Sequence, residues 1–249
     1  MTDSERTTNK VAAVTLAFWV TKIAATTLGE TAGDLFSMTL GLGYAVSSII
    51  LVGLFAIALG FQLAARSFRP FLFWSVVLLT STAGTTLSDF MDRSLGLGYA
   101  AGSTIIAASL AAVLLAWRAV EGSLSVESIT TRRAELFYWV AILFSNTLGT
   151  ALGDFLADDS GLGFLGGAIL VGSVIAAIAV ASVLTRWNRV ALFWLAFVLT
   201  RPLGATFGDF LTKPTDSGAL GLGTIGSSAV LLAILIVSVE ISRRREDAV

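Results

Sequence analysis

Long apolar stretches alternate with short polar segments along the whole chain. Eight such stretches of about 18–24 residues cover 11–33, 43–63, 70–88, 97–117, 135–153, 162–184, 190–208 and 219–240. About 20 apolar residues in a helix cross the ~30 Å hydrocarbon core of a bilayer. Backbone polar groups in lipid must be satisfied within their own segment, and the strand-like alternation of apolar and polar residues is missing. The pattern therefore predicts an all-α membrane protein with eight transmembrane helices.

One pattern of residues occurs four times. Each copy has an aromatic residue followed by Trp, an Asp fifteen positions after the Trp, and a Gly five positions before the Asp. A Gly-Leu-Gly follows at 41–43, 96–98, 161–163 and 221–223. The Trp and Asp pairs are Trp19 and Asp34, Trp74 and Asp89, Trp139 and Asp154, and Trp194 and Asp209. Each copy holds two apolar stretches, so we expect four two-helix repeats in parallel orientation.

The spacing of the repeated Asp residues divides the chain into halves. Successive spacings are 55, 65 and 55 residues, so the ten additional residues fall at the midpoint. We expect a cytoplasmic N-terminal tail at 1–10, a first half at 11–117, a cytoplasmic linker at 118–134, a second half at 135–241 and a cytoplasmic C-terminal tail at 242–249.

The placement of Lys and Arg predicts the orientation in the membrane. Twelve of them lie in segments on one side of the spans: Arg6, Lys10, Arg66, Arg69, Arg118, Arg132, Arg133, Arg186, Arg189, Arg243, Arg244 and Arg245. The opposite segments hold only Arg93 and Lys213. Because cytoplasmic loops are enriched in Lys and Arg, we expect both termini in the cytoplasm and the Asp-bearing helix ends outside.

Composition narrows the chemistry. The chain is 55% hydrophobic, only 13% charged, and has neither Cys nor His, with a net charge of −1. Disulfides, thiolate and imidazole metal ligands, and His general bases are excluded, and the charge gives no basis for nucleic-acid binding. A bound metal must be a hard cation held by oxygen atoms. No nucleophile–base pair is readable, so we expect the chain not to be an enzyme and to need no cofactor.

Three charged residues fall well inside the predicted spans: Lys22, Glu30 and Arg201. An ionised side chain at the centre of a span costs roughly 2.5–3.5 kcal/mol, so these three would cost on the order of 8–10 kcal/mol if they faced lipid. They must face each other or a wet cavity. Buried ion pairs of Glu30 with Lys22, or of an Asp with Arg201, are the purely architectural alternative.

The repeated Asp residues lie at the outer ends of their helices, where a negative charge opposes the helix macrodipole. A shared cation would compensate them, whereas capping is the simpler explanation, above all for Asp89 and Asp154. We predict Glu30, Asp34 and Asp209 as metal ligands. The candidate transport site comprises Lys22, Thr27, Glu30, Asp34, Asp89, Asp154, Arg201 and Asp209. Its path would be lined by Thr26, Thr27, Thr31, Thr85, Thr86, Asn146, Thr147, Thr150 and Thr206.

Small residues predict which helices touch. Each first helix of a repeat carries two small residues four positions apart: Gly29 and Gly33, Gly84 and Ser88, Gly149 and Gly153, Gly204 and Gly208. Such pairs let helices approach closely in lipid. We therefore expect the first, third, fifth and seventh helices to form an inner bundle and the others an outer ring. The repeated Trp residues, with Trp117 and Trp187, fit anchors at the cytoplasmic interface.

Two motifs carry a family resemblance. The segments Phe-Trp-x-x-Lys-x-x-x-Thr-Thr-x-Gly-Glu-Thr-x-x-Asp at 18–34 and Leu-Thr-Arg-Pro-Leu-Gly-Ala at 199–205 resemble a bacterial integral membrane family of tandem repeats of unknown function. The resemblance covers about residues 11–240 and implies four repeats, each with two transmembrane segments and one Trp, in the bacterial inner membrane. Matching positions are Trp19, Lys22, Thr27, Glu30, Asp34, Trp74, Asp89, Trp139, Asp154, Trp194, Arg201, Pro202 and Asp209.

The segment 30–34, Glu-x-x-Gly-Asp, is loosely similar to the acidic motif of a cation/proton exchanger family. It lacks a second Glu, because the equivalent positions hold Thr85, Thr150 and Ala205. We expect a small transporter or exporter that moves a hard divalent or monovalent cation in exchange for protons, with the bilayer and the ion as its partners. Lys22 and Arg201 also fit an anionic or zwitterionic substrate. The alternative is a non-transporting scaffold or subunit, and either fits an oligomer.

Overall fold

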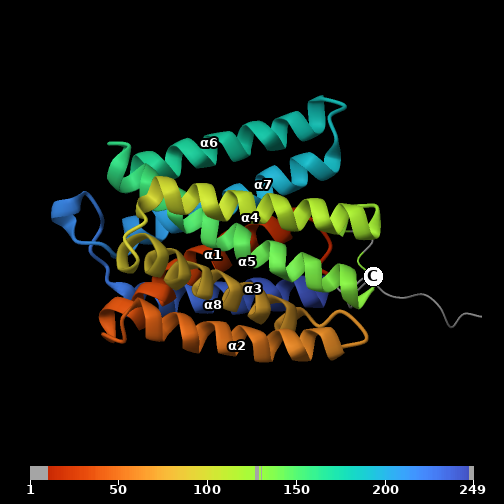
Figure 1. Ribbon diagram of the computed structural model, residues 1–249, viewed down its shortest axis with the longest axis horizontal. Helices are drawn as coiled ribbons and strands as arrows, with labels where there is room; N and C mark the ends of the chain where they lie inside the picture. The colour runs from red at the N-terminus through yellow and green to blue at the C-terminus, as the bar shows by residue number, and fades with distance from the viewer. Residues whose placement is uncertain (1–10, 127–128, 130, 247–249) are drawn as a thin grey trace, which may run out of the picture.

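The computed structural model describes residues 11–126, 129 and 131–246, and within them it has eight long helices and no strand (Figure 1). The first helices of the repeats are α1 (Leu16–Asp34), α3 (Pro70–Asp89), α5 (Arg132–Asp154) and α7 (Arg189–Thr212). The second helices are α2 (Tyr44–Ala64), α4 (Gly98–Glu121), α6 (Gly163–Leu184) and α8 (Thr224–Glu246). The predicted all-α chain of eight helices is confirmed. The expected N-terminal tail lies outside the described residues.

Seven of the described helices are long and apolar enough to cross a membrane, and α1 is the exception. The charged residues of α1 are Lys22, Glu30 and Asp34. Thirteen of its nineteen residues are buried, so protein rather than lipid surrounds its polar side chains. The helix therefore needs little apolar surface of its own.

The four odd-numbered helices form a closed ring. α1 packs on α3, α3 on α5, α5 on α7, and α7 again on α1. Each even-numbered helix lies outside the ring against the inner helix of the next repeat: α2 on α3, α4 on α5, α6 on α7 and α8 on α1. More than half of the apolar span is buried in α3, α5 and α7, against 17–28% in the even helices. In Figure 1, α2 and α6 accordingly lie at opposite edges of the bundle.

The repeated glycine is the contact point of neighbouring inner helices. Each one touches a residue of the next repeat, in the pairs Gly29 and Ser81, Gly84 and Asn146, Gly149 and Arg201, and Gly204 and Thr26. A Cβ atom at any of the four would lie within 3.0 Å of that neighbour. The pairs run from repeat 1 to 4 and back to 1, so the packing predicted from the small residues closes into a pseudo-fourfold ring.

The inner helices do not stop at the repeated Asp. In repeats 1 to 3 the chain continues through one π-helical turn: Leu35–Thr39, Phe90–Ser94 and Phe155–Asp159. In repeat 4 the Gly-Leu-Gly begins twelve rather than seven positions after the Asp. There α7 is followed by a short 3₁₀ turn, Thr215–Ser217. Both glycines of every Gly-Leu-Gly have φ between 66° and 77°. This motif is therefore a turn that needs glycine.

Aromatic side chains close the opposite end of the ring. The aromatic residue before each Trp contacts the Trp of the next repeat, with centroids 5.4–6.5 Å apart: Phe18 and Trp74, Phe73 and Trp139, Tyr138 and Trp194, Phe193 and Trp19. Trp74, Trp139, Trp194 and Trp117 are at most 6% exposed. Their predicted role as interface anchors is therefore wrong, because they fill the bundle where its helices converge. Trp187, 66% exposed, remains compatible with an anchor.

We predict that Gly149→Leu destabilises the protein, because its side chain would overlap the Cβ and Cγ of Arg201. Overpacking costs typically 1–3 kcal/mol and more when backbone must move. Gly53→Leu on α2 is the matched control, since a Cβ at Gly53 meets nothing within 4 Å. Thermal unfolding in detergent measures both. Equal melting temperatures for the two variants would contradict the ring packing.

Candidate functional site

The four repeated Asp residues come together at one end of the inner ring, each 3% exposed. Two basic side chains connect them in pairs. Arg93 lies 3.0 Å from Asp89 and 3.2 Å from Asp154, measured from its nitrogens to their carboxylate oxygens. The Lys213 Nζ lies 2.6 Å from Asp34 and 3.3 Å from Asp209. Each base thus bridges the Asp of its own repeat and the Asp of the next.

The positions of these bases reduce the symmetry of the ring. Arg93 and Lys213 each come four residues after the Asp of repeats 2 and 4, where helical geometry brings the two side chains together. The same position holds Met38 in repeat 1 and Asp158 in repeat 3. Bases in alternate repeats therefore convert a pseudo-fourfold ring of carboxylates into two bridged pairs related by a pseudo-twofold axis.

Lys213 follows the end of α7 and is 18% exposed. Burial lowers its pKa, but the carboxylates of Asp209 and Asp34 raise it by more, so the pKa lies above its ordinary range. Lys213 therefore remains a cation at neutral pH, and its one positive charge is shared by two of the four repeated Asp residues.

One helical turn inside the four Asp residues, at the level of Glu30, the guanidinium of Arg201 on α7 contacts the other three inner helices. Its guanidinium lies 2.8 Å from Glu30 on α1 and donates to the hydroxyls of Thr85 on α3 and Thr150 on α5. It also donates to the backbone carbonyl oxygens of Thr26 and Ser81, at 3.3 and 3.4 Å. The planar fork of arginine suits this arrangement, in which one group satisfies several acceptors at once. Arg201 is fully buried.

Lys22 lies deeper still and does not pair with Glu30. It is fully buried, its Nζ has no hydrogen-bond partner among the described residues, and it lies 4.2 Å from the ring centroid of Phe197. A cation over an aromatic ring gains electrostatic stabilisation. The suggested pairs of Glu30 with Lys22 and of an Asp with Arg201 are both wrong, because Arg201 forms its ion pair with Glu30.

The polar lining is less connected than the sequence suggested. Of the nine predicted lining residues, all are buried, but only Thr85 and Thr150 bond to the side chain of Arg201 through their own side chains. Thr27 donates to the carbonyl oxygen of Ile23 on its own helix, at 2.9 Å. Such bonds satisfy a hydroxyl locally without aiming it at a ligand.

Three carboxylates lie close enough to hold one cation. One oxygen from each of Glu30, Asp34 and Asp209 lies within 4.8 Å of the other two. These are the residues that the sequence predicted as metal ligands, and oxygen atoms suit a hard cation. Arg201 and Lys213 contact the same carboxylates. A cation would therefore compete with the chain's own bases.

The cluster carries unequal charge. Five buried carboxylates, namely Glu30 and the four repeated Asp residues, face three bases, Arg93, Arg201 and Lys213. Counting these eight groups alone, all ionised, the carboxylates exceed the bases by two; Asp158, 44% exposed, also lies 4.0 Å from Arg93. The roles of Arg93 and Lys213 were missed from the sequence, although their spacing of four residues from an Asp was a readable signal.

Comparison with known proteins gives one result. The family described as Repeat of Unknown Function (DUF347) matches residues 17–68, 72–123, 137–187 and 192–247. The chain belongs to this repeat family. Each match contains one inner and one outer helix, so the four predicted repeats are confirmed. No curated protein and no solved structure matches the chain.

We predict that Glu30 and Arg201 compensate each other. Arg201→Met leaves the Glu30 carboxylate buried without its cation and should destabilise the protein by about 3–5 kcal/mol. Adding Glu30→Gln should recover much of that loss, because no unpaired charge remains. Unfolding of the two single variants and the double variant in detergent measures the coupling. Additive losses would show that the two side chains do not act as a pair.

Proposed function

We propose that the chain is a small multi-pass transporter or exporter of the bacterial inner membrane that exchanges a hard metal cation for protons. The carrying observation is the cluster of five buried carboxylates with three bases. Intramembrane ionisable groups are costly and mark ion or proton pathways. A bundle of internal repeats with its charges on the inner helices is the usual architecture of such proteins.

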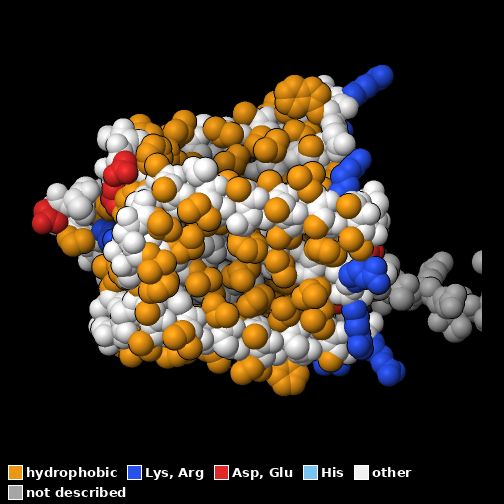
Figure 2. Space-filling view, viewed as in Figure 1, with side chains coloured by type: hydrophobic (Ala, Val, Ile, Leu, Met, Phe, Trp, Pro, Cys, Tyr) orange, Lys and Arg blue, Asp and Glu red, His pale blue; other side chains and the backbone are white. Residues whose placement is uncertain are grey.

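The proposed orientation places both termini in the cytoplasm and the carboxylate cluster toward the outside. Figure 2 supports it, because Lys and Arg side chains gather at one end of the molecule, the end where the C-terminus lies in Figure 1. The twelve-to-two division of Lys and Arg along the sequence has the same direction. All four repeats then cross the membrane in parallel, with the inner helices running outward.

The proposed cycle follows from the excess of two negative charges. Protonation of two carboxylates, or binding of one divalent cation, would neutralise the cluster. Glu30, Asp34 and Asp209 would supply the cation ligands, and Lys213 would move aside within the cluster when the cation enters, so that its charge still counts in the balance. Protons and cation thus compete for the same oxygens, which is the chemical requirement for exchange. Asp89 and Asp154, bridged by Arg93, would complete the ring of carboxylates, and Thr27, Thr150 and Lys22 would border the inner path.

We predict that Glu30→Gln and Asp34→Asn abolish cation-coupled proton movement while the protein stays folded. The purified protein is reconstituted into liposomes with a pH-sensitive dye inside, and Mn²⁺, Mg²⁺, Ca²⁺ or Na⁺ is added outside. Wild-type liposomes should change internal pH with at least one cation, and both variants should resemble empty liposomes. Glu135→Gln is the matched control, because Glu135 is a buried carboxylate bonded to Gln62 at the other end of α5. If no cation moves protons in the wild type, exchange is wrong.

The scaffold alternative has its own support, since most charges of the cluster already have partners within the chain. Because the chain has no Cys, single Cys replacements at Thr27 and Thr150 separate the two functions. Both residues are buried, at 1% and 0% exposure. A transporter that opens outward should let a membrane-impermeant thiol reagent label both from outside. Complete protection of both in membranes under every pH and cation condition would favour the scaffold.

A further inference from the structure

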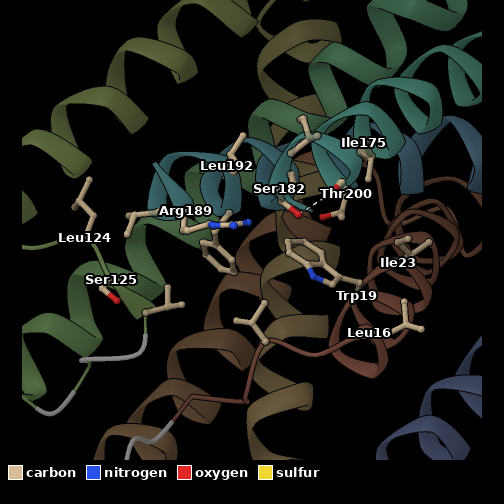
Figure 3. A pocket seen from close by; sticks show the side chains of 17 residues that line it. Leu16, Trp19, Ile23, Leu124, Ser125, Ile175, Ser182, Arg189, Leu192 and Thr200 are labelled. Carbon is tan, nitrogen blue, oxygen red and sulfur yellow. Dashed lines mark hydrogen bonds between the residues drawn. The ribbon is translucent and has the colours of Figure 1, made fainter. Parts of the chain in front are cut away.

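A cavity of about 620 Å³ opens in the half of the bundle away from the carboxylates (Figure 3). It lies between α1, α6 and α7 and is bordered by residues 124–126. Its walls are mostly apolar, with Trp19, Ile23 and Phe193 on the inner helices and Ile175 on α6. Thr200, next to Arg201 in the chain, lies at its inner wall. Volumes of about 300–1,000 Å³ with such walls are typical of small-molecule sites.

The position in repeat 2 that is equivalent to this cavity is occupied by a tryptophan side chain. In α4, Trp117 is 1% exposed and packs between Tyr138 and Trp194, with ring centroids 6.4 and 5.8 Å away. Trp117 comes 28 residues after Asp89, and the residue 28 positions after Asp154 is Ser182, which borders the cavity.

The aromatic neighbours have counterparts too. Phe193 of repeat 4 and Trp19 of repeat 1 correspond to Tyr138 of repeat 3 and Trp194 of repeat 4. Both Phe193 and Trp19 line the cavity. Trp19 is only half-buried, unlike its three counterparts. The cavity therefore lies at the position that repeat 2 fills with the indole of Trp117 and where repeat 3 has a serine. In repeat 1 the same position holds Gln62, whose side chain is buried against Glu135.

The polar rim specifies the rest of the ligand. Arg189 is exposed and points toward the cavity in Figure 3, and it forms no ion pair with any described residue. Among the described residues, no carboxylate lines the cavity. The Ser182 hydroxyl already donates to the carbonyl oxygen of Ala179, at 2.7 Å. We propose that this cavity binds a planar aromatic molecule that carries an anionic group, with the ring packed against Trp19 and Phe193 and the anion at Arg189. The site is independent of the proposed cation exchange.

Indole-3-acetate and uncharged indole are suitable probes. Binding to the purified protein is measured by equilibrium dialysis against protein-free micelles of the same detergent. Ser182→Trp should fill the cavity from within and weaken both probes more than tenfold. Ser173→Trp is the matched control, since Ser173 is exposed on α6 and does not border the cavity. Arg189→Gln should weaken indole-3-acetate about tenfold, as expected for one charged partner, and leave indole unchanged.

Several results would overturn the proposal. It is wrong if the wild type binds neither probe, or if Ser182→Trp binds both as well as Ser173→Trp does. It is also wrong if native mass spectrometry shows a phospholipid that Ser182→Trp excludes and indole-3-acetate does not displace, because the occupant would then be lipid. If Ser182→Trp does not fold, Ala179→Leu narrows the same cavity and replaces it in the comparison.

Discussion

The contact of Arg201 with the other three inner helices is the interaction on which the centre of this protein depends. A guanidinium in the middle of a helical bundle needs acceptors around it, and here α1, α3 and α5 each provide one, while the Nε of Arg201 has no hydrogen-bond partner among the described residues. The guanidinium reaches them because Gly149 lets the stem of Arg201 lie directly on α5. The glycine that lets α5 and α7 approach closely is therefore the same residue that lets the buried guanidinium reach its partners.

Around this centre, nearly identical repeats have acquired different chemistry at equivalent positions. One turn inside the repeated Asp, the four repeats carry Glu30, Thr85, Thr150 and Ala205. The inner helices and their glycine contacts recur in all four repeats, whereas the side chains at these equivalent positions differ. The result is an asymmetric site, with an acid on α1 facing a base on α7, inside a backbone whose four repeats are arranged symmetrically around one axis.

Most of the fold could be predicted from the sequence, because it follows from local periodicity. The apolar stretches gave the helices to within a few residues at most ends, and the small residues indicated the inner layer. The partners of the charges could not be predicted in the same way. Whether Glu30 meets Lys22 or Arg201 depends on the order of the helices around the ring, which no local pattern encodes. The burial of Trp139 likewise depends on its contact with Phe73, a residue of another repeat.

The packing of α8 on α1 has a consequence for the history of the chain. Each outer helix covers the inner helix of the following repeat, and the last covers the first, so every repeat–repeat interface is of the head-to-tail kind. Head-to-tail contacts whose rotation closes generate rings from identical subunits. Four separate two-helix proteins could have assembled in this way before gene fusion joined them. Joined in one chain, a single repeat can carry an arginine while the other three do not, which a ring of identical subunits cannot do.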